Sequence, residues 1–235
     1  MRKAVFFDLD GTLLALDMER FTSMYFSLVE NCGFYKLFGD DGKRVFGSGI
    51  YAILNNDGAM LNRDIFLKVV SEASGANPDA ILDHMDAFYI NEFPKIRACA
   101  HSDERAVETV RILKEKGYRL ILSTNPIFPS SATNVRIEWA GLSPDDFEYV
   151  SYYDNSHYCK PNLEYFKEIL DHTGLAAKDC YVIGNDVRED MGATTLGFEG
   201  FLLLDNVIGD LGRVPPCKQG NYSDLLSFAK NLPPV

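Results

Sequence analysis

Residues 4–14 read AVFFDLDGTLL, and this stretch decides the fold. Val5–Phe7 is an unbroken apolar run, which predicts a strand buried on both faces of a sheet. Asp8 and Asp10 follow it two residues apart, so in extended geometry their side chains leave the same face. Two like charges at a strand end repel each other more strongly as water is excluded. The stretch therefore predicts either a solvated turn or a site in which a cation lies between the two carboxylates.

Strands and helices alternate from residue 102 onward. This alternation predicts βαβ units and an α/β fold with a doubly wound, Rossmann-like parallel sheet. Ser102 is the expected N-cap of the first of these helices. The expected helices span 102–117, 130–140, 162–174 and 188–197, and the expected strands lie in 118–126, 147–154, 180–186 and 200–205.

Residues 17–97 read as mostly helical and separate the first strand from the rest of the sheet. Within this segment, N-cap residues mark the expected starts of helices and glycines mark their expected ends. We expect a core domain of residues 1–15 and 98–235 and an inserted α-helical cap domain of residues 16–97.

The expected strands end in polar side chains. In open parallel sheets, ligands bind beyond the carboxyl ends of the strands. Four distant segments should therefore bring carboxylates, a hydroxyl, an amide and an amine to one edge of the sheet. The residues concerned are Asp8, Asp10, Ser123, Thr124, Asn125, Lys160, Asp186 and Asp190.

Carboxylates without a His or Cys partner are hard oxygen ligands, which suit Mg²⁺ better than zinc. A lysine and a threonine hydroxyl can hold an oxyanion beside such a metal. This inventory matches phosphoryl transfer, where positioning and charge neutralisation supply most of the catalysis. An aspartate can act as the nucleophile, and a second carboxylate can protonate the leaving oxygen and then activate water. The sequence thus predicts two carboxylates with two roles and one Mg²⁺.

Four motifs carry a resemblance to a known family. They are DLDGT at 8–12, STN at 123–125, KP at 160–161 and GNDVRED at 184–190. Their types and order resemble those of the haloacid dehalogenase (HAD) superfamily, in particular its phosphatase-type members such as phosphoglycolate phosphatase and the β-phosphoglucomutase group. The helical insertion is similar to the C1 cap of that superfamily.

The resemblance implies roles for the reacting residues. Asp8 would be the nucleophile and Asp10 the general acid/base. Thr124 would hydrogen-bond the transferring phosphoryl group, a role that Ser123 could share. Lys160 would neutralise Asp8 and the phosphate.

The resemblance also implies a metal site. Asp8 would bind Mg²⁺ through its carboxylate and Asp10 through its backbone carbonyl. Asp186 would bind the metal directly, and Asp190 would do so through water or brace the other ligands. Asn125 would orient the substrate.

The expected activity is Mg²⁺-dependent hydrolysis of a small phosphorylated metabolite. Dehalogenases of the superfamily lack the second aspartate of the first motif, so Asp10 favours phosphate chemistry over carbon–halogen cleavage. A sugar phosphomutase of the β-phosphoglucomutase kind is the alternative, which needs basic cap residues to hold a second phosphate. A phospho-accepting regulatory module is a third reading.

Composition excludes several other classes. The net charge of −11 and the lack of a Lys/Arg cluster argue against a nucleic-acid partner. No apolar run approaches the roughly 18 residues of a membrane span. The five cysteines are scattered without a CxxC pair, as expected for reduced thiols in the cytoplasm.

The aromatic residues of the insertion have two readings. FTSMYF at 21–26, DAFYI at 86–90 and the single Trp139 have helical spacing, which favours the interior of the protein over a substrate slot. The basic residues Lys36, Lys43, Arg44 and Arg63 accompany many acids, which favours a solvated surface.

Overall fold

The computed structural model describes residues 3–235, so the first two residues of the expected core domain lie outside it. Six strands form one parallel sheet in the order β5-β4-β1-β6-β7-β8. This is the α/β fold with a Rossmann-like parallel sheet that the sequence predicts. The strands are β1 (Ala4–Phe7), β4 (Arg119–Leu122), β5 (Tyr149–Val150), β6 (Cys180–Gly184), β7 (Glu199–Leu203) and β8 (Lys218–Gly220).

The apolar run at the start of the chain forms a central strand. All four residues of β1 are fully buried, as predicted for a strand covered on both faces. Phe7 lies opposite Leu122 of β4 and Ile183 of β6. Because the strands are parallel and in this register, Asp8 and the residues that follow Leu122 and Ile183 leave the sheet at the same edge.

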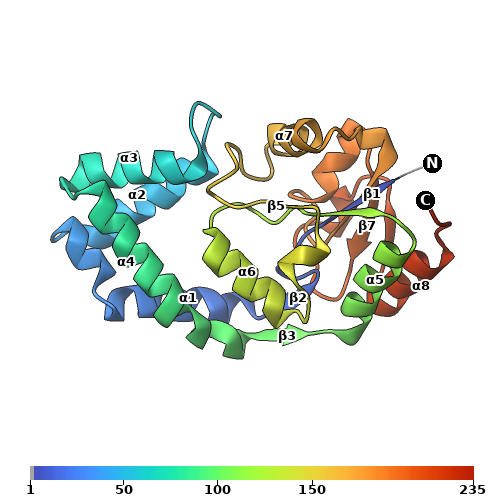
Figure 1. Ribbon diagram of the computed structural model, residues 1–235, viewed down its shortest axis with the longest axis horizontal. Helices are drawn as coiled ribbons and strands as arrows, with labels where there is room; N and C mark the ends of the chain where they lie inside the picture. Colours follow the sequence, from blue (N-terminus) through green and yellow to red (C-terminus); the bar gives the residue numbers. More distant parts are fainter. Residues whose placement is uncertain (1–2) are drawn as a thin grey trace.

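Helices cover both faces of the sheet (Figure 1). Val5 and Phe7 pack in the same core cluster as residues of α5 (Glu104–Glu115), α6 (Ser130–Trp139) and α8 (Tyr222–Asn231). Ala4 and Phe6 point to the opposite face and pack with residues of α7 (Leu163–Thr173). Alternate side chains of one strand thus serve two separate cores, which explains the unbroken apolar run.

The helical insertion joins the core through a two-stranded ribbon. β2 (Leu14–Leu16) pairs antiparallel with β3 (Ala100–Ser102), so the chain leaves and returns at neighbouring points. The expected boundary after residue 15 falls within β2 and the one before residue 98 falls in the 3₁₀ helix Phe93–Cys99 that precedes β3, and we retain the two-domain division as a proposal. Between the two strands lie α1 (Met18–Asn31), α2 (Gly42–Leu54), α3 (Asn62–Ser74) and α4 (Pro78–Asn91), with 3₁₀ helices at Phe34–Phe38 and Phe93–Cys99.

Several local expectations are wrong. Asp103, not Ser102, caps α5, because the Asp103 carboxylate accepts a hydrogen bond from the Arg105 amide while Ser102 pairs in β3. The helix expected over 188–197 is a turn followed by a 3₁₀ helix, Met191–Leu196. Its Gly192 and two threonines are weak helix formers. The sequence reading also did not include β2, β3, β8 or α8. Short 3₁₀ helices at Pro144–Asp146, Ala177–Asp179 and Leu211–Arg213 complete the fold.

Within residues 3–235, no helix is long and apolar enough to cross a membrane. Within the described part of the chain, none of the cysteines forms a disulfide.

Candidate active site

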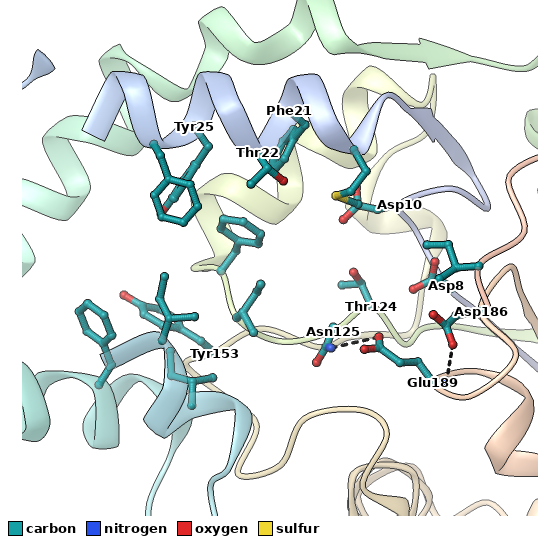
Figure 2. A pocket seen from close by; sticks show the side chains of 18 of the residues that line it. Asp8, Asp10, Phe21, Thr22, Tyr25, Thr124, Asn125, Tyr153, Asp186 and Glu189 are labelled. Atoms are coloured by element: carbon teal, nitrogen blue, oxygen red, sulfur yellow. Dashed lines mark hydrogen bonds between the residues drawn. The ribbon is translucent and has the colours of Figure 1, made fainter. Parts of the chain in front are cut away.

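A cavity of about 340 Å³ lies between the polar edge of the sheet and the helices of the insertion. Figure 2 shows the carboxylates, Thr124 and Asn125 gathered on one side, with Phe21 and Tyr25 of α1 on the other. The predicted residues Asp8, Asp10, Thr124, Asn125, Asp186 and Asp190 all line this cavity. Six of the eight residues expected at this edge therefore face one space, Lys160 bonds to two of them from behind, and Ser123 does not line the cavity.

Lys160 bridges two of these carboxylates. Its ammonium group donates to Asp8 Oδ1 at 2.9 Å and to Asp190 Oδ1 at 2.6 Å. Burial of Lys160 disfavours its charge, but the two carboxylates outweigh this effect and raise the pKa of Lys160 well above its ordinary value. The lysine is thus a fixed cation behind Asp8, and it relieves the repulsion between two buried acids.

Asp10 is held by a partner that the sequence reading did not identify. Arg136 of α6 donates to Asp10 Oδ2, and its other donors bond to Thr133 Oγ1 and the Ala132 carbonyl. The guanidinium also lies over the Phe128 ring, 4.6 Å from its centroid. Burial raises the pKa of Asp10, and the charge of Arg136 opposes this rise.

One signal in the sequence could have indicated Arg136. It lies on the buried side of α6 with Ala132 and Ile137, and only 1% of its surface is exposed. A charged residue at an apolar helix position requires a buried partner of opposite charge. Asp10 is that partner.

Asn125 and Glu189 link the second motif to the fourth. Asn125 Nδ2 donates to Glu189 Oε2 at 3.2 Å (Figure 2). Burial raises the pKa of Glu189, which also lines the cavity. Glu189 lies within the GNDVRED motif, yet the sequence reading assigned it no role.

The fourth motif folds as a tight turn around Asp186. Asp186 Oδ1 accepts hydrogen bonds from the backbone amides of Arg188 and Glu189, both at 2.7 Å. Asp190 Oδ2 in turn accepts from the Asp186 amide at 3.0 Å. Both oxygens of Asp190 are therefore bonded, which suits a bracing role, whereas Asp186 keeps one oxygen for the cavity.

Asn185 links the first motif to the fourth by a hydrogen bond. It accepts a hydrogen bond from Thr12 Oγ1 at 3.0 Å and donates to the Asn206 carbonyl at 2.7 Å. Gly11 lies against the same side chain, because a Cβ at Gly11 would come within 2.3 Å of Asn185 Nδ2. Asn185 thus fixes the loop that carries Asp8 and Asp10.

The structure separates the two hydroxyls of the second motif. Ser123 Oγ donates to the Phe7 carbonyl and is occupied in joining β4 to β1. Thr124 lines the cavity, and its own carbonyl accepts hydrogen bonds from Ser151 Oγ and Tyr165 Oη. Thr124, rather than Ser123, is therefore placed to meet a ligand.

The donor set fits Mg²⁺, although no three acidic, imidazole or thiol groups in residues 3–235 form a ready metal cluster. Asp10 Oδ1 and Asn125 Oδ1 are buried, and neither accepts a hydrogen bond from the described residues. Asp8 and Asp186 each keep one carboxylate oxygen that accepts no hydrogen bond from that part of the chain. Unpartnered hard oxygens that face one cavity are the ligands that Mg²⁺ prefers.

The opposite wall of the cavity comes from the insertion and corrects one expectation. Phe21, Tyr25 and Phe26 of α1 and Tyr89 of α4 line the cavity, so part of the aromatic pattern does not belong to the protein interior alone. The expectation holds for Trp139, which stacks on the Phe93 ring with centroids 5.6 Å apart.

The four basic residues of the insertion behave as expected. None lines the cavity among the residues described, and Lys43, Arg44 and Arg63 form surface ion pairs with Glu30, Asp41 and Asp64.

Comparison with known protein families gives a match over most of the chain. Residues 2–194 match the protein family described as haloacid dehalogenase-like hydrolase, which covers most of the chain. No curated protein matches the sequence.

Solved structures with the same fold include both phosphatases and dehalogenases. A HAD phosphatase from Thermococcus onnurineus is 19% identical with a TM-score of 0.59, over 99% of this chain and 100% of that one. A predicted phosphoglycolate phosphatase from Haemophilus somnus is 17% identical with a TM-score of 0.58, over 97% of each chain. An L-2-haloacid dehalogenase from Xanthobacter autotrophicus is 13% identical with a TM-score of 0.58, over 99% and 100%. At these identities the likeness shows the fold alone.

Proposed function

The chain belongs to the haloacid dehalogenase-like hydrolase family, and from that premise we propose that it is a Mg²⁺-dependent phosphatase of a small phosphomonoester. One observation carries the proposal. Asp10 lines the cavity beside Asp8, with one oxygen held by Arg136 and the other buried without a partner. A carboxyl group in this position suits proton transfer to a leaving oxygen. The resemblance to the superfamily implies that its dehalogenases lack the second aspartate of the first motif, the position that Asp10 occupies here.

The first step forms a phosphorylated enzyme. A carboxylate oxygen of Asp8 attacks the phosphorus, and the bond between phosphorus and the ester oxygen breaks. Asp10 donates its proton to that oxygen, so that the alcohol leaves neutral. Burial raises the pKa of Asp10, which favours the protonated form that this step needs.

The second step restores the enzyme. The Asp10 carboxylate takes a proton from a water molecule, whose oxygen attacks the phosphorus. The bond from Asp8 to phosphorus breaks, inorganic phosphate leaves, and Asp10 is protonated again. Lys160 stays hydrogen-bonded to Asp8 Oδ1 and fixes the orientation of the nucleophile. The hydroxyl of Thr124, which lines the cavity, donates a hydrogen bond to a phosphoryl oxygen.

Asp8 and Asp186 would hold Mg²⁺ through their unbonded oxygens, with Asp190 bracing the turn. When bound, the metal supplies positive charge that offsets the phosphoryl oxygens and the surrounding acids. This positive charge is needed because the cavity that would receive the phosphate is lined by four acidic side chains, those of Asp8, Asp10, Asp186 and Glu189.

The cavity supports hydrolysis over the sugar phosphomutase alternative. A mutase must hold a phosphate at both ends of its substrate, which needs cations on the cap side. Of the described residues, no Lys, Arg or His lines the cavity. A regulatory phospho-acceptor would need neither this cavity nor the second carboxylate.

The test is phosphate release from p-nitrophenyl phosphate with Mg²⁺ or with EDTA. We expect activity in Mg²⁺ that EDTA abolishes, and losses of about 10³-fold or more in Asp8→Asn and Asp10→Asn. Asp40→Asn, at an exposed acid of the insertion, is the matched control and should keep full activity. Circular dichroism verifies that each variant folds.

A parallel assay measures chloride release from 2-chloropropionate. Chloride release without phosphate release would overturn the proposal, as would an Asp10→Asn variant with unchanged turnover.

A further inference from the structure

The wall of the cavity that faces the carboxylates is apolar. Each of the four long helices of the insertion contributes to it, including Phe21 of α1, Phe46 and Ile53 of α2, Phe66 of α3 and Met85 of α4. Most of these side chains are nearly fully buried, so their rings and methyl groups have fixed positions. The bound molecule must therefore present its phosphate to one wall and its remaining atoms to an apolar surface.

Few polar groups interrupt this apolar wall. The hydroxyls of Tyr25 and Tyr89 bond to each other at 3.0 Å, so these two residues direct their polar atoms at one another. Thr22 and Tyr153 supply the other hydroxyls on this side. A sugar or polyol would leave most of its hydroxyl groups without partners, at a large loss of affinity.

Cations are also absent from the cavity lining in residues 3–235. Arg136, the nearest arginine to the site in the hydrogen-bond network, has its donors directed at Asp10, Thr133 and Ala132. A second phosphate or a carboxylate on the leaving group would be buried against aromatic rings with no counter-charge. This disfavours bisphosphates and carboxylated esters such as phosphoglycolate.

The rim of the cavity is apolar as well. Met18, Phe26 and Ile208 line the cavity, and between 41% and 46% of each remains exposed to solvent. Exposed apolar side chains around a pocket are typical of a surface that receives an apolar ligand. The volume of about 340 Å³ lies near the small end of the range for ligand pockets, which suits a leaving group of one or two rings or a short chain.

We propose that the substrate is the phosphate monoester of an apolar alcohol, aromatic or aliphatic. The inference rests on the proposed phosphatase function and names its substrate class. The carboxylate wall reacts with the phosphate, and the wall formed by the insertion selects the alcohol by burying its apolar surface.

The first test measures kcat/KM for a series of alkyl phosphates of increasing length, and for naphthyl phosphate as an aromatic substrate. For the alkyl series we expect kcat/KM to rise about fourfold per added methylene group until the cavity is filled. Glucose 6-phosphate, glycerol phosphate and phosphoglycolate should react at least about 100-fold more slowly than the best apolar ester. Equal rates across the series, or a preference for the polar esters, would overturn the inference.

A pair of surface variants tests the wall without disturbing the interior. Phe26→Asn changes an exposed residue of the rim, whereas Tyr51→Asn changes an aromatic residue of α2 that is 68% exposed and does not line the cavity. The ratio of kcat/KM for naphthyl phosphate to that for methyl phosphate should fall about tenfold in Phe26→Asn. The ratio should stay at the wild-type value in Tyr51→Asn.

Calorimetric binding of 1-naphthol to the full chain separates the two proposals. We expect saturable binding of one naphthol, weakened in Phe26→Asn. Phosphate release without apolar preference and without naphthol binding would overturn the inference and leave the proposed function standing. Naphthol binding without phosphate release from any ester would overturn the proposed function and retain the apolar specificity of the cavity.

Discussion

The protonation of Asp10 depends on two opposing influences, its burial in the cavity wall and the charge of the buried Arg136. Burial favours its protonated form, and Arg136 favours its charged form. Arg136 also fixes one carboxylate oxygen, so only the other oxygen is free to face a ligand. In the proposed function Asp10 acts as the general acid, which needs a defined orientation as well as a proton, and Arg136 would supply the orientation.

The Asp10–Arg136 pair predicts strong coupling in stability. Arg136→Met leaves the Asp10 carboxylate without its cation and should lower the free energy of unfolding by about 3 kcal/mol. The double variant Arg136→Met/Asp10→Asn should recover at least half of this loss, because no buried charge is left unpaired. Urea denaturation in metal-free buffer measures both.

Arg111→Met is the matched control for this cycle. Arg111 pairs with Glu108 on the surface of α5, and its loss should lower the free energy of unfolding by less than about 1 kcal/mol. Equal losses in the two arginine variants would contradict the importance of the buried pair.

Gly11 predicts a second effect at a single residue. Its φ of +89° and its approach to Asn185 leave no room for a side chain. Gly11→Ala should lower the free energy of unfolding by about 2 kcal/mol or more, since backbone strain and a displaced Asn185 act together. Gly174 has a φ of +65°, and a Cβ added there would have no other atom within 4 Å. Gly174→Ala should therefore lower the free energy of unfolding by a smaller amount, from backbone strain alone, as thermal unfolding can measure.

The sequence predicts a site from side chains near strand ends and from the order of four motifs. Strand polarity brings Asp186, just after β6, to the same edge as Asp8, whereas Lys160 follows β5 only after a loop and was predicted from motif order. Arg136 could be suspected from its helical spacing with Ala132 and Ile137, but its partner Asp10 could not be predicted, since that contact depends on how α6 packs over the sheet. Glu189 was missed for a related reason: its contact with Asn125 joins residues 64 positions apart in the chain.

At the scale of elements, the start of α5 depends on one carboxylate. Asp103→Ala should lower the free energy of unfolding by about 1 kcal/mol at pH 7, while Ser102→Ala, one residue earlier, should change it by less than about 0.5 kcal/mol. Reversal of the two effects would show that the cap is Ser102 after all.

The same element predicts a pH dependence. The hydrogen bond from Arg105 lowers the pKa of Asp103, so the folded state favours the charged carboxylate. The stabilisation is fully present above the ordinary carboxyl pKa of about 4 and is lost as the pH falls through the lowered value. The difference between wild type and Asp103→Ala should therefore be constant from pH 7 to 5 and shrink at pH 3, as urea denaturation can measure.

The helical spacing of apolar residues in the insertion could not show which of them pack in the interior and which line the cavity. Phe21 and Phe88 both recur at helical intervals, but Phe21 lines the large cavity and Phe88 does not. An apolar face looks the same in the sequence whether a neighbouring helix or a ligand covers it. The strands β2, β3 and β8 have three residues each, too few to show an alternation of apolar and polar side chains, whereas the short β5 lies in the longer run of β-forming residues 147–154.

At the scale of the whole molecule, the net charge of −11 opposes the approach of a phosphate dianion. Salt screens this repulsion over roughly 10 Å at 0.1 M. With Mg²⁺ saturating, kcat/KM for a dianionic ester should rise several-fold as ionic strength increases from about 0.02 to 0.2 M, while kcat changes little. Steady-state kinetics in NaCl, with sucrose as a viscosity control, measures the effect; a fall in kcat/KM would contradict it.

The antiparallel ribbon of β2 and β3 has a consequence for changes in the insertion. Leu16 lies opposite Ala100, so the whole insertion leaves and rejoins the core at a single point. A segment with adjacent ends can be exchanged for a longer, shorter or unrelated one without shifting the register of the sheet. Replacing the insertion could therefore change the apolar wall of the cavity while Asp8, which follows β1, keeps its position.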